Sequence, residues 1–129
     1  MIGPLYLGDY FFCDVDATRD EELAALIADL RNPEAYCGGL DLAFDRLLVA
    51  TYAHSNPSED VFLLYERDGV LYEANIDQSS GQGWLMDEDV THVDTLLHRL
   101  EHGSITGDTE WDSEIAAFLR TYVAAGGQE

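Results

Sequence analysis

The sequence predicts an α+β domain in which a mostly antiparallel sheet of about four strands is packed by about three helices on one face. Two β-rich runs flank Asp68-Gly69, which is a preferred two-residue turn of a β-hairpin. Three other segments carry apolar residues at helical spacing. The length of 129 residues corresponds to one domain, which we expect to span residues 1–129.

The expected strands follow from β-favouring composition. We expect strands over residues 9–15 and 47–54 and a hairpin over residues 61–76. Residues 61–65 are all apolar, as in a central strand. One side of the second hairpin arm carries mostly polar residues, so we expect this side to lie largely in water; it consists of Leu71, Glu73, Asn75 and Asp77. Residues 78–89 predict the longest irregular loop of the chain.

The first helix has the clearest start and stop signals. Thr18-Arg19-Asp20-Glu21 matches a capping box, and Asn32-Pro33 predicts the end of the helix. Between them lies one apolar stripe made of Leu23, Leu26, Ile27 and Leu30. Two further helices are expected, one over residues 90–101 and one from near Asp112 to Gly126-Gly127.

The charge balance excludes several classes of function. The chain has 26 acidic and 6 basic residues, hence a formal net charge of −20. Direct binding of nucleic acid needs clustered lysine and arginine, and docking on anionic membranes needs the same. No apolar run approaches the length of a membrane span, and the N-terminal residues do not match a signal peptide. Cys13 and Cys37 form no metal-binding spacing, so we expect a cytoplasmic protein with reduced thiols.

The amount of charge favours a basic protein as partner. Twenty charges correspond to about 34 Å of duplex DNA, close to the diameter expected of the folded domain. The charge is compatible with mimicry of nucleic acid, with a local acidic patch that inhibits a basic toxin, or with adaptation to high salt without any partner.

An aromatic residue beside acidic residues is the predicted contact with such a partner, because the ring fills a pocket while the carboxylates pair with arginine or lysine. The candidate partner-binding residues are Trp84, Asp87, Glu88, Asp89, Glu59 and Asp60. Alternatively, Trp84 folds back over the sheet and Asp87 or Asp89 caps the next helix. Asp112 has a similar expected capping role in the last helix.

Catalytic and metal-binding patterns are weak. His98 and His102 lie four residues apart, with Asp94 one turn earlier, but the chain has no HExxH motif. The alternative is a solvated helix face. No nucleophile elbow or phosphate-binding loop is present, and we expect neither a catalytic residue nor a cofactor.

Residues 47–103 contain two runs that are similar to a segment of known proteins. The run YERDGVLYEAN followed by VTHVDTLLHRLEHG is similar to a segment of small acidic bacterial and phage-borne proteins. Such proteins often have a cysteine-containing loop where this chain has IDQSSGQGWLMDED. The resemblance implies an α+β domain. By size and charge the chain is also similar in type to immunity proteins of bacterial toxin systems.

The leading expectation is therefore a non-enzymatic acidic binding protein, specifically an immunity-type inhibitor of a basic toxin that acts on nucleic acid. One alternative is a DNA mimic that blocks a restriction, CRISPR or other DNA-binding protein. Another is a small enzyme or metal-binding protein built on His98 and His102.

Overall fold

Five strands form one sheet in the order β1-β2-β3-β4-β5 in the computed structural model, which describes residues 4–8, 19–31, 42–55, 58–78 and 85–126. The strands are β1 (Leu5–Gly8), β2 (Arg46–Ser55), β3 (Ser58–Arg67), β4 (Val70–Gln78) and β5 (Leu85–Val90). The helices are α1 (Arg19–Arg31), α2 (Val93–His102) and α3 (Thr109–Ala124). Strands β1 and β2 are parallel, and the other neighbouring pairs are antiparallel. The α+β class is confirmed, with one strand more than expected.

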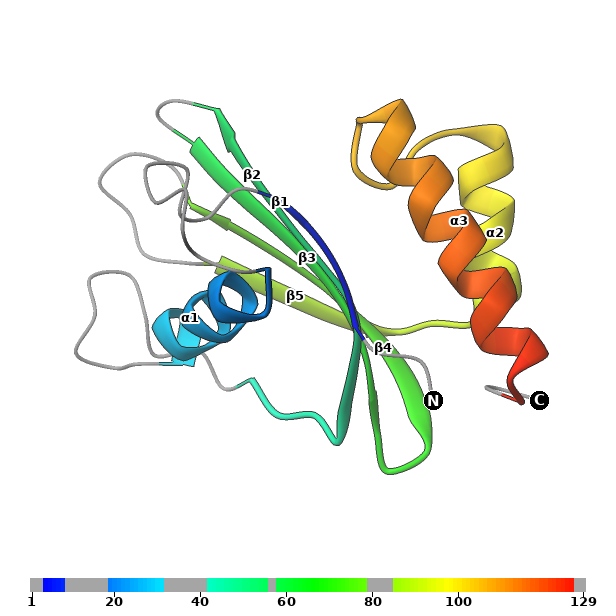
Figure 1. Cartoon of the computed structure of the whole chain (residues 1–129), viewed down its shortest axis with the longest axis horizontal. Coiled ribbons are helices and arrows are strands. Elements are labelled where there is room, and N and C mark those ends of the chain that lie inside the picture. The colour runs from blue at the N-terminus through cyan, green and yellow to red at the C-terminus, as the bar shows by residue number, and fades with distance from the viewer. Residues whose placement is uncertain (1–3, 9–18, 32–41, 56–57, 79–84, 127–129) are drawn as a thin grey trace.

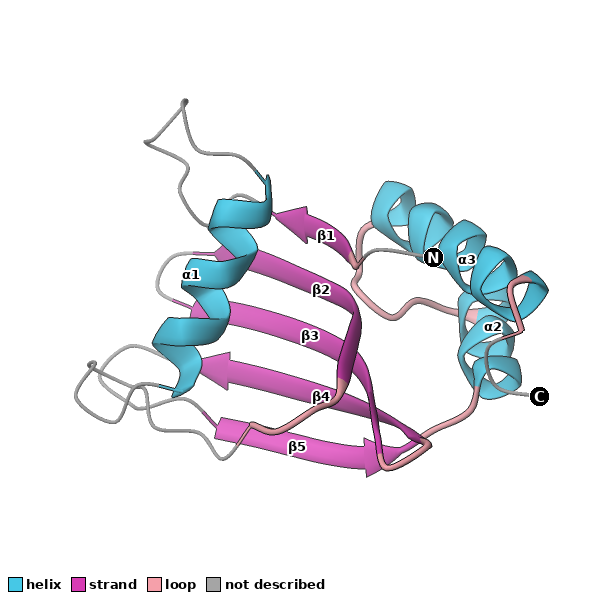
Figure 2. Cartoon of the chain, turned by 60° about the horizontal axis from the view of Figure 1, so that its bottom comes forward, coloured by secondary structure: helices cyan, strands magenta, loops and turns pink. Residues whose placement is uncertain are grey.

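The helices cover both faces of the sheet rather than one, so the expectation of a single covered face is wrong. Helix α1 lies on one face, and the α2–α3 pair lies on the other, toward one end of the strands (Figures 1 and 2). The reason lies in β3, where residues 61–65 are all buried. Because successive side chains of a strand point to opposite faces, such a run needs a core on each side.

Each core cluster combines alternate residues of β3 with one set of helices. Val61, Leu63 and Tyr65 pack with the predicted apolar stripe of α1. Phe62 and Leu64 pack with residues of α2 and α3. No helix within the described segments is long and apolar enough to cross a lipid bilayer.

The hairpin forms as the sequence predicts. Asp68 and Gly69 have φ angles of 55° and 78°. Positive φ at both positions is the signature of the two-residue turn that matches the twist of the flanking strands. The turn pairs Arg67 with Val70, and the register then continues without a shift to Glu59 and Gln78.

One boundary differs from expectation, and one predicted strand is not tested. Residues 85–90, expected at the end of a loop and the start of a helix, form edge strand β5, where charged side chains are well tolerated. The predicted strand over residues 9–15 lies outside the described residues.

The capping roles predicted for the two later helices are also wrong, whereas Thr18 of the capping box predicted for α1 lies outside the described residues. His92, rather than Asp87 or Asp89, caps α2, and its Nδ1 accepts a hydrogen bond from the Asp94 amide at 3.1 Å. Asp108, rather than Asp112, caps α3 and accepts hydrogen bonds from two amides of its first turn.

The side of β4 that was predicted to lie in water, formed by Leu71, Glu73, Asn75 and Asp77, is exposed at only two of its four residues. Asn75 and Asp77 are exposed as predicted, but Leu71 is buried and Glu73 is only 8 % exposed. Both oxygens of Glu73 accept hydrogen bonds from Nη1 of Arg99 in α2, at 2.9 and 2.7 Å. This ion pair lets α2 cover a carboxylate that would otherwise need water.

Replacing Arg99 by methionine should therefore destabilise the protein by about 2 kcal/mol, because it leaves the Glu73 carboxylate largely buried without a cation. Urea unfolding of the wild type and the variant measures this difference. The double variant Glu73→Met/Arg99→Met should recover most of the loss, since two apolar side chains can replace a buried pair. A double variant as unstable as Arg99→Met alone would contradict this account.

Candidate functional site

An open groove of about 270 Å³ lies between the sheet and the connection from α2 to α3. Its sheet side includes Thr51, Asp60, Phe62, Asn75, Asp77 and Asp87. Its opposite side includes Ile105, Thr106 and Trp111. These residues come from the four adjacent strands β2 to β5, from the connection between α2 and α3, and from the start of α3. We call this feature the acidic groove.

Strand register brings the three carboxylates of the groove together. Asp60 of β3 lies directly opposite Asp77 of β4, and Asp87 of β5 lies opposite Asn75. Because side chains two residues apart on a strand share a face, all three carboxylates lie on the same side of the sheet. Like charges that face each other across a strand pair repel.

No arginine is among the described residues that line the groove. Three of the six arginines instead pair elsewhere: Arg46 with Glu66 at 3.8 Å, Arg67 with Glu88 at 2.9 Å and Arg99 with Glu73 at 2.7 Å. None of the ion pairs among the described residues includes Asp60, Asp77 or Asp87. The negative charge of these three carboxylates is therefore available to a cation that binds in the groove.

The floor of the groove is well buried. Thr51 and Phe62, which lie opposite each other on β2 and β3, are each 4 % exposed. Both residues line the groove.

The opposite wall is held in shape by Asp112. Its Oδ1 accepts hydrogen bonds from the amides of Ile105 and Thr106, at 3.3 and 3.1 Å, and from the Thr106 hydroxyl at 2.9 Å. Burial raises the pKa of Asp112, but these bonds and one from Ser104 outweigh it, so the pKa lies below its ordinary value. Asp112 thus fixes the connection that carries Ile105 and Thr106.

The structure brings together some of the predicted partner-binding residues and separates others. Asp60 and Asp87 line the groove, and both are exposed. Asp89 is exposed on the same face, opposite Glu73, but does not line the groove. Trp84 and the side chain of Glu59 lie outside the described parts of the chain.

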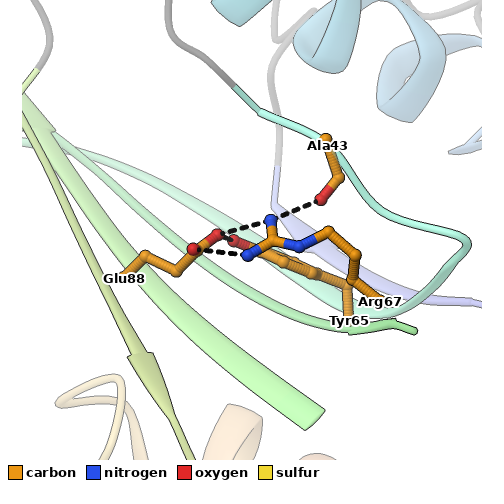
Figure 3. A network of polar contacts seen from close by, with 4 residues as sticks. All are labelled: Ala43, Tyr65, Arg67 and Glu88. Carbon is orange, nitrogen blue, oxygen red and sulfur yellow. Dashed lines mark hydrogen bonds and ion pairs between the residues drawn. The ribbon is translucent and has the colours of Figure 1, made fainter. Parts of the chain in front are cut away.

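Glu88 points to the other face, so its predicted place in a partner contact is wrong. Its carboxylate accepts hydrogen bonds from Nη2 and Nη1 of Arg67, at 2.9 and 3.2 Å, and from the Tyr65 hydroxyl (Figure 3). Arg67 also donates to the backbone oxygen of Ala43 at 3.0 Å, and its guanidinium lies 4.3 Å from the ring centre of Tyr72. The network ties the edge strand β5 to β3.

The contacts of this network shift the pKa values of Glu88 and Tyr65 in opposite directions. The hydrogen bond from Arg67 holds the pKa of Glu88 below its ordinary value, against the opposing effect of burial. Burial first, and then the hydrogen bond to Glu88, raises the pKa of Tyr65. The ionised Glu88 carboxylate thus stabilises the fold by accepting hydrogen bonds from Arg67 and Tyr65.

The predicted metal ligands of α2, His98, His102 and Asp94, are not part of a larger cluster of potential ligands in the described segments. The rings of His98 and His102 lie 4.4 Å apart, but no group of three or more potential ligands occurs in the segments that the structure describes.

Asp77, Thr51 and Trp111 are groove residues that sequence reasoning missed. The Asp68-Gly69 turn could have identified Asp77, because counting outward from the turn places it opposite Asp60. No comparable signal exists for Trp111, whose place depends on the path of the chain between α2 and α3.

Glu88→Gln should destabilise the protein by about 1–2 kcal/mol at pH 7, because it weakens charge-assisted hydrogen bonds. The pKa of Glu88 is lowered on folding, so its contribution is complete above the ordinary value of 4.5 and is lost as pH falls through the lowered value. Urea unfolding at pH 7 and below pH 4.5 should therefore show a difference that narrows in acid. The exposed control Glu101→Gln should change stability little at pH 7. A difference from wild type that is independent of pH would contradict the assignment.

Asp77→Asn should stabilise the protein by on the order of 0.5 kcal/mol at low salt, because it removes the repulsion with Asp60. Asp60→Asn should have a similar effect, and the double variant should gain little more. Unfolding measured at low and high salt checks this, since screening should shrink all three gains. Fully additive gains would show that the two carboxylates do not interact.

No family model, curated protein or solved structure matches the chain in the comparisons with known proteins. The geometry of the acidic groove is therefore the basis for the function proposed below.

Proposed function

We propose that the chain is a non-enzymatic acidic binding protein, and specifically an immunity-type inhibitor that neutralises a basic toxin acting on nucleic acid. The observation that carries the proposal is the acidic groove, where Asp60, Asp77 and Asp87 lie together without a cation among the described lining residues. A toxin that acts on nucleic acid needs a positively charged substrate surface. Such a surface is complementary to this groove.

The form of the groove favours a localised contact over mimicry of DNA. A DNA mimic needs carboxylates in a long double row, whereas an inhibitor needs a patch with an aromatic residue at its side. The three carboxylates lie on adjacent strands of one sheet face, and Trp111 lines the same groove. Aromatic residues are typical anchors of protein interfaces.

The overall charge supports rapid association with such a partner. A net charge of −20 extends an attractive field well beyond the groove at low salt. Association rates can then approach about 10⁸–10⁹ M⁻¹s⁻¹, and salt slows them. The groove provides short-range contacts that screening weakens much less once they are desolvated.

Capture from a lysate of the source organism, at about 50 and about 300 mM salt, tests this proposal. We expect one basic protein to remain bound at the higher salt. That protein is then purified, and its activity on nucleic acid is measured with and without the chain. The proposal requires inhibition at equimolar amounts. Capture of many DNA-binding proteins that all dissociate at the higher salt would instead favour a DNA mimic.

Matched variants assign the contact to the groove. Asp60→Asn/Asp77→Asn/Asp87→Asn should weaken affinity for the purified partner at least about 100-fold, because paired charges at an interface are each worth about a factor of ten or more. Glu101→Gln/Glu110→Gln/Glu114→Gln removes the same charge from exposed positions of α2 and α3 and should weaken it less than about tenfold. Equal losses would contradict a role for the groove.

A further inference from the structure

We propose that the open edge of β5 binds an extended basic segment of the partner as an additional strand of the sheet. This inference rests on the proposed function, because it states how the chain would hold a basic toxin. Three observations carry it: the position of β5 in the sheet, the direction of its backbone groups, and the side chains on its two faces.

Strand β5 lies at an edge of the sheet (Figure 2). It pairs with β4 on one side, and no strand of the described segments pairs with its other side. An unpaired edge presents a row of backbone N–H and C=O groups that another extended chain can bind. The opposite edge, β1, has four residues, whereas β5 has six. Strand β5 is therefore the longer template for strand addition.

The backbone groups of every second β5 residue point toward the open edge. In an antiparallel pair, successive residues direct their N–H and C=O groups alternately toward the partner strand and away from it. Thr91, directly after β5, donates its amide to the carbonyl oxygen of Leu71 at 3.0 Å. Counting back from Thr91 through the continuous register, the residues with outward backbone groups are Val90, Glu88 and Met86.

The side chains of β5 favour a segment in which basic and apolar residues alternate. Asp87 and Asp89 are exposed on the side of the sheet that carries α2 and α3. On the other side, Glu88 is already paired with Arg67, and the Val90 side chain is 67 % exposed. An added strand would thus place basic side chains beside the two aspartates and apolar side chains beside Val90.

The same charges argue against a second copy of this chain as the added strand. Antiparallel pairing of two β5 strands would bring the aspartates of one copy close to those of the other, where like charges repel. Two chains with a net charge of −20 also repel each other at longer range. A cationic strand is attracted by both effects, so charge selects a basic partner.

Strand addition at β5 would also continue the acidic groove. Asp87 belongs to β5 and lines the groove. A basic side chain beside Asp87 would therefore lie at the margin of the groove. The partner would then be held by backbone hydrogen bonds along the edge and by charge pairs at the groove.

An acetylated and amidated hexapeptide of alternating arginine and valine tests the inference. At saturation, hydrogen exchange measured by NMR should slow at least about tenfold for the amides of Met86, Glu88 and Val90, because new backbone hydrogen bonds protect them. The amides of Asp87 and Asp89 already face β4 and should change less than about threefold. A peptide with its arginines in one block and its valines in another should bind at least about fivefold more weakly, because its charges cannot all face one side.

Two results would overturn the inference. One is the lack of saturable binding, or binding without alternating protection along β5. The other is a concentration-dependent dimer, detected by sedimentation without peptide, in which the same alternate amides are protected. The added strand would then come from a second copy of the chain.

Val90→Pro removes one outward N–H group and should weaken peptide binding about fivefold or more. Because that N–H makes no bond to β4, the edge strand should tolerate proline at its last residue. Val90→Thr keeps the N–H group and should weaken binding less than about threefold. A well-dispersed spectrum shows that each variant is folded. Wild-type affinity in a folded Val90→Pro variant would contradict pairing at this edge.

A second pair of variants tests the charge of the edge. Asp87→Asn/Asp89→Asn should weaken binding of the alternating peptide about tenfold or more, because it removes both carboxylates beside the added strand. Glu110→Gln/Glu114→Gln removes the same charge from exposed positions of α3 and should weaken it less than about threefold. Equal losses would show that net charge alone attracts the peptide and would contradict recognition by β5.

The outcomes also separate this inference from the proposed function. If a toxin is captured and inhibited as well by Val90→Pro as by the wild type, the inhibitor stands and strand addition is wrong. If the peptide adds to β5 but no basic protein is captured and inhibited, strand addition stands and the inhibitor is wrong.

Discussion

The two-residue turn at Asp68-Gly69 is the constraint on which both the core and the groove depend. A slip of one residue in the β3–β4 register would turn every side chain of one strand to the opposite face. Leu63 and Tyr65 would then leave the core under α1, and Asp77 would no longer lie opposite Asp60. One pair of positive φ angles therefore determines which carboxylates meet at the groove.

Much of the fold follows from local sequence signals. Helix α1 lies where its apolar stripe and Asn32-Pro33 place it, and the hairpin forms around its turn. Strand β5 could not be predicted, because its acidic sequence has low β-propensity and it is a strand only through pairing with β4. The covering of Glu73 was missed for a similar reason, since its partner Arg99 is 26 positions away in the sequence.

The candidate site was predictable only in part. The acidic residues near positions 60 and 87 could be identified from the sequence. The side of the sheet on which residues 87–89 lie depends on β5, however, and the sequence does not predict that strand. Alternation along β5 then separates Asp87 from Glu88, which are neighbours in the chain. Trp111 reaches the groove because Asp108 and Asp112 shape the chain around the start of α3, a tertiary arrangement without a periodic signal.

This alternation along β5 has a consequence for how the protein can evolve. Glu88 is hydrogen-bonded to Tyr65 and Arg67, so substitutions at these three positions must compensate one another. Asp87 faces away from them and forms no ion pair within the described segments. The edge strand can thus change its exposed side chains at every second residue while the intervening residues keep the sheet intact, so the surface that we propose to bind a partner can diversify without loss of the fold.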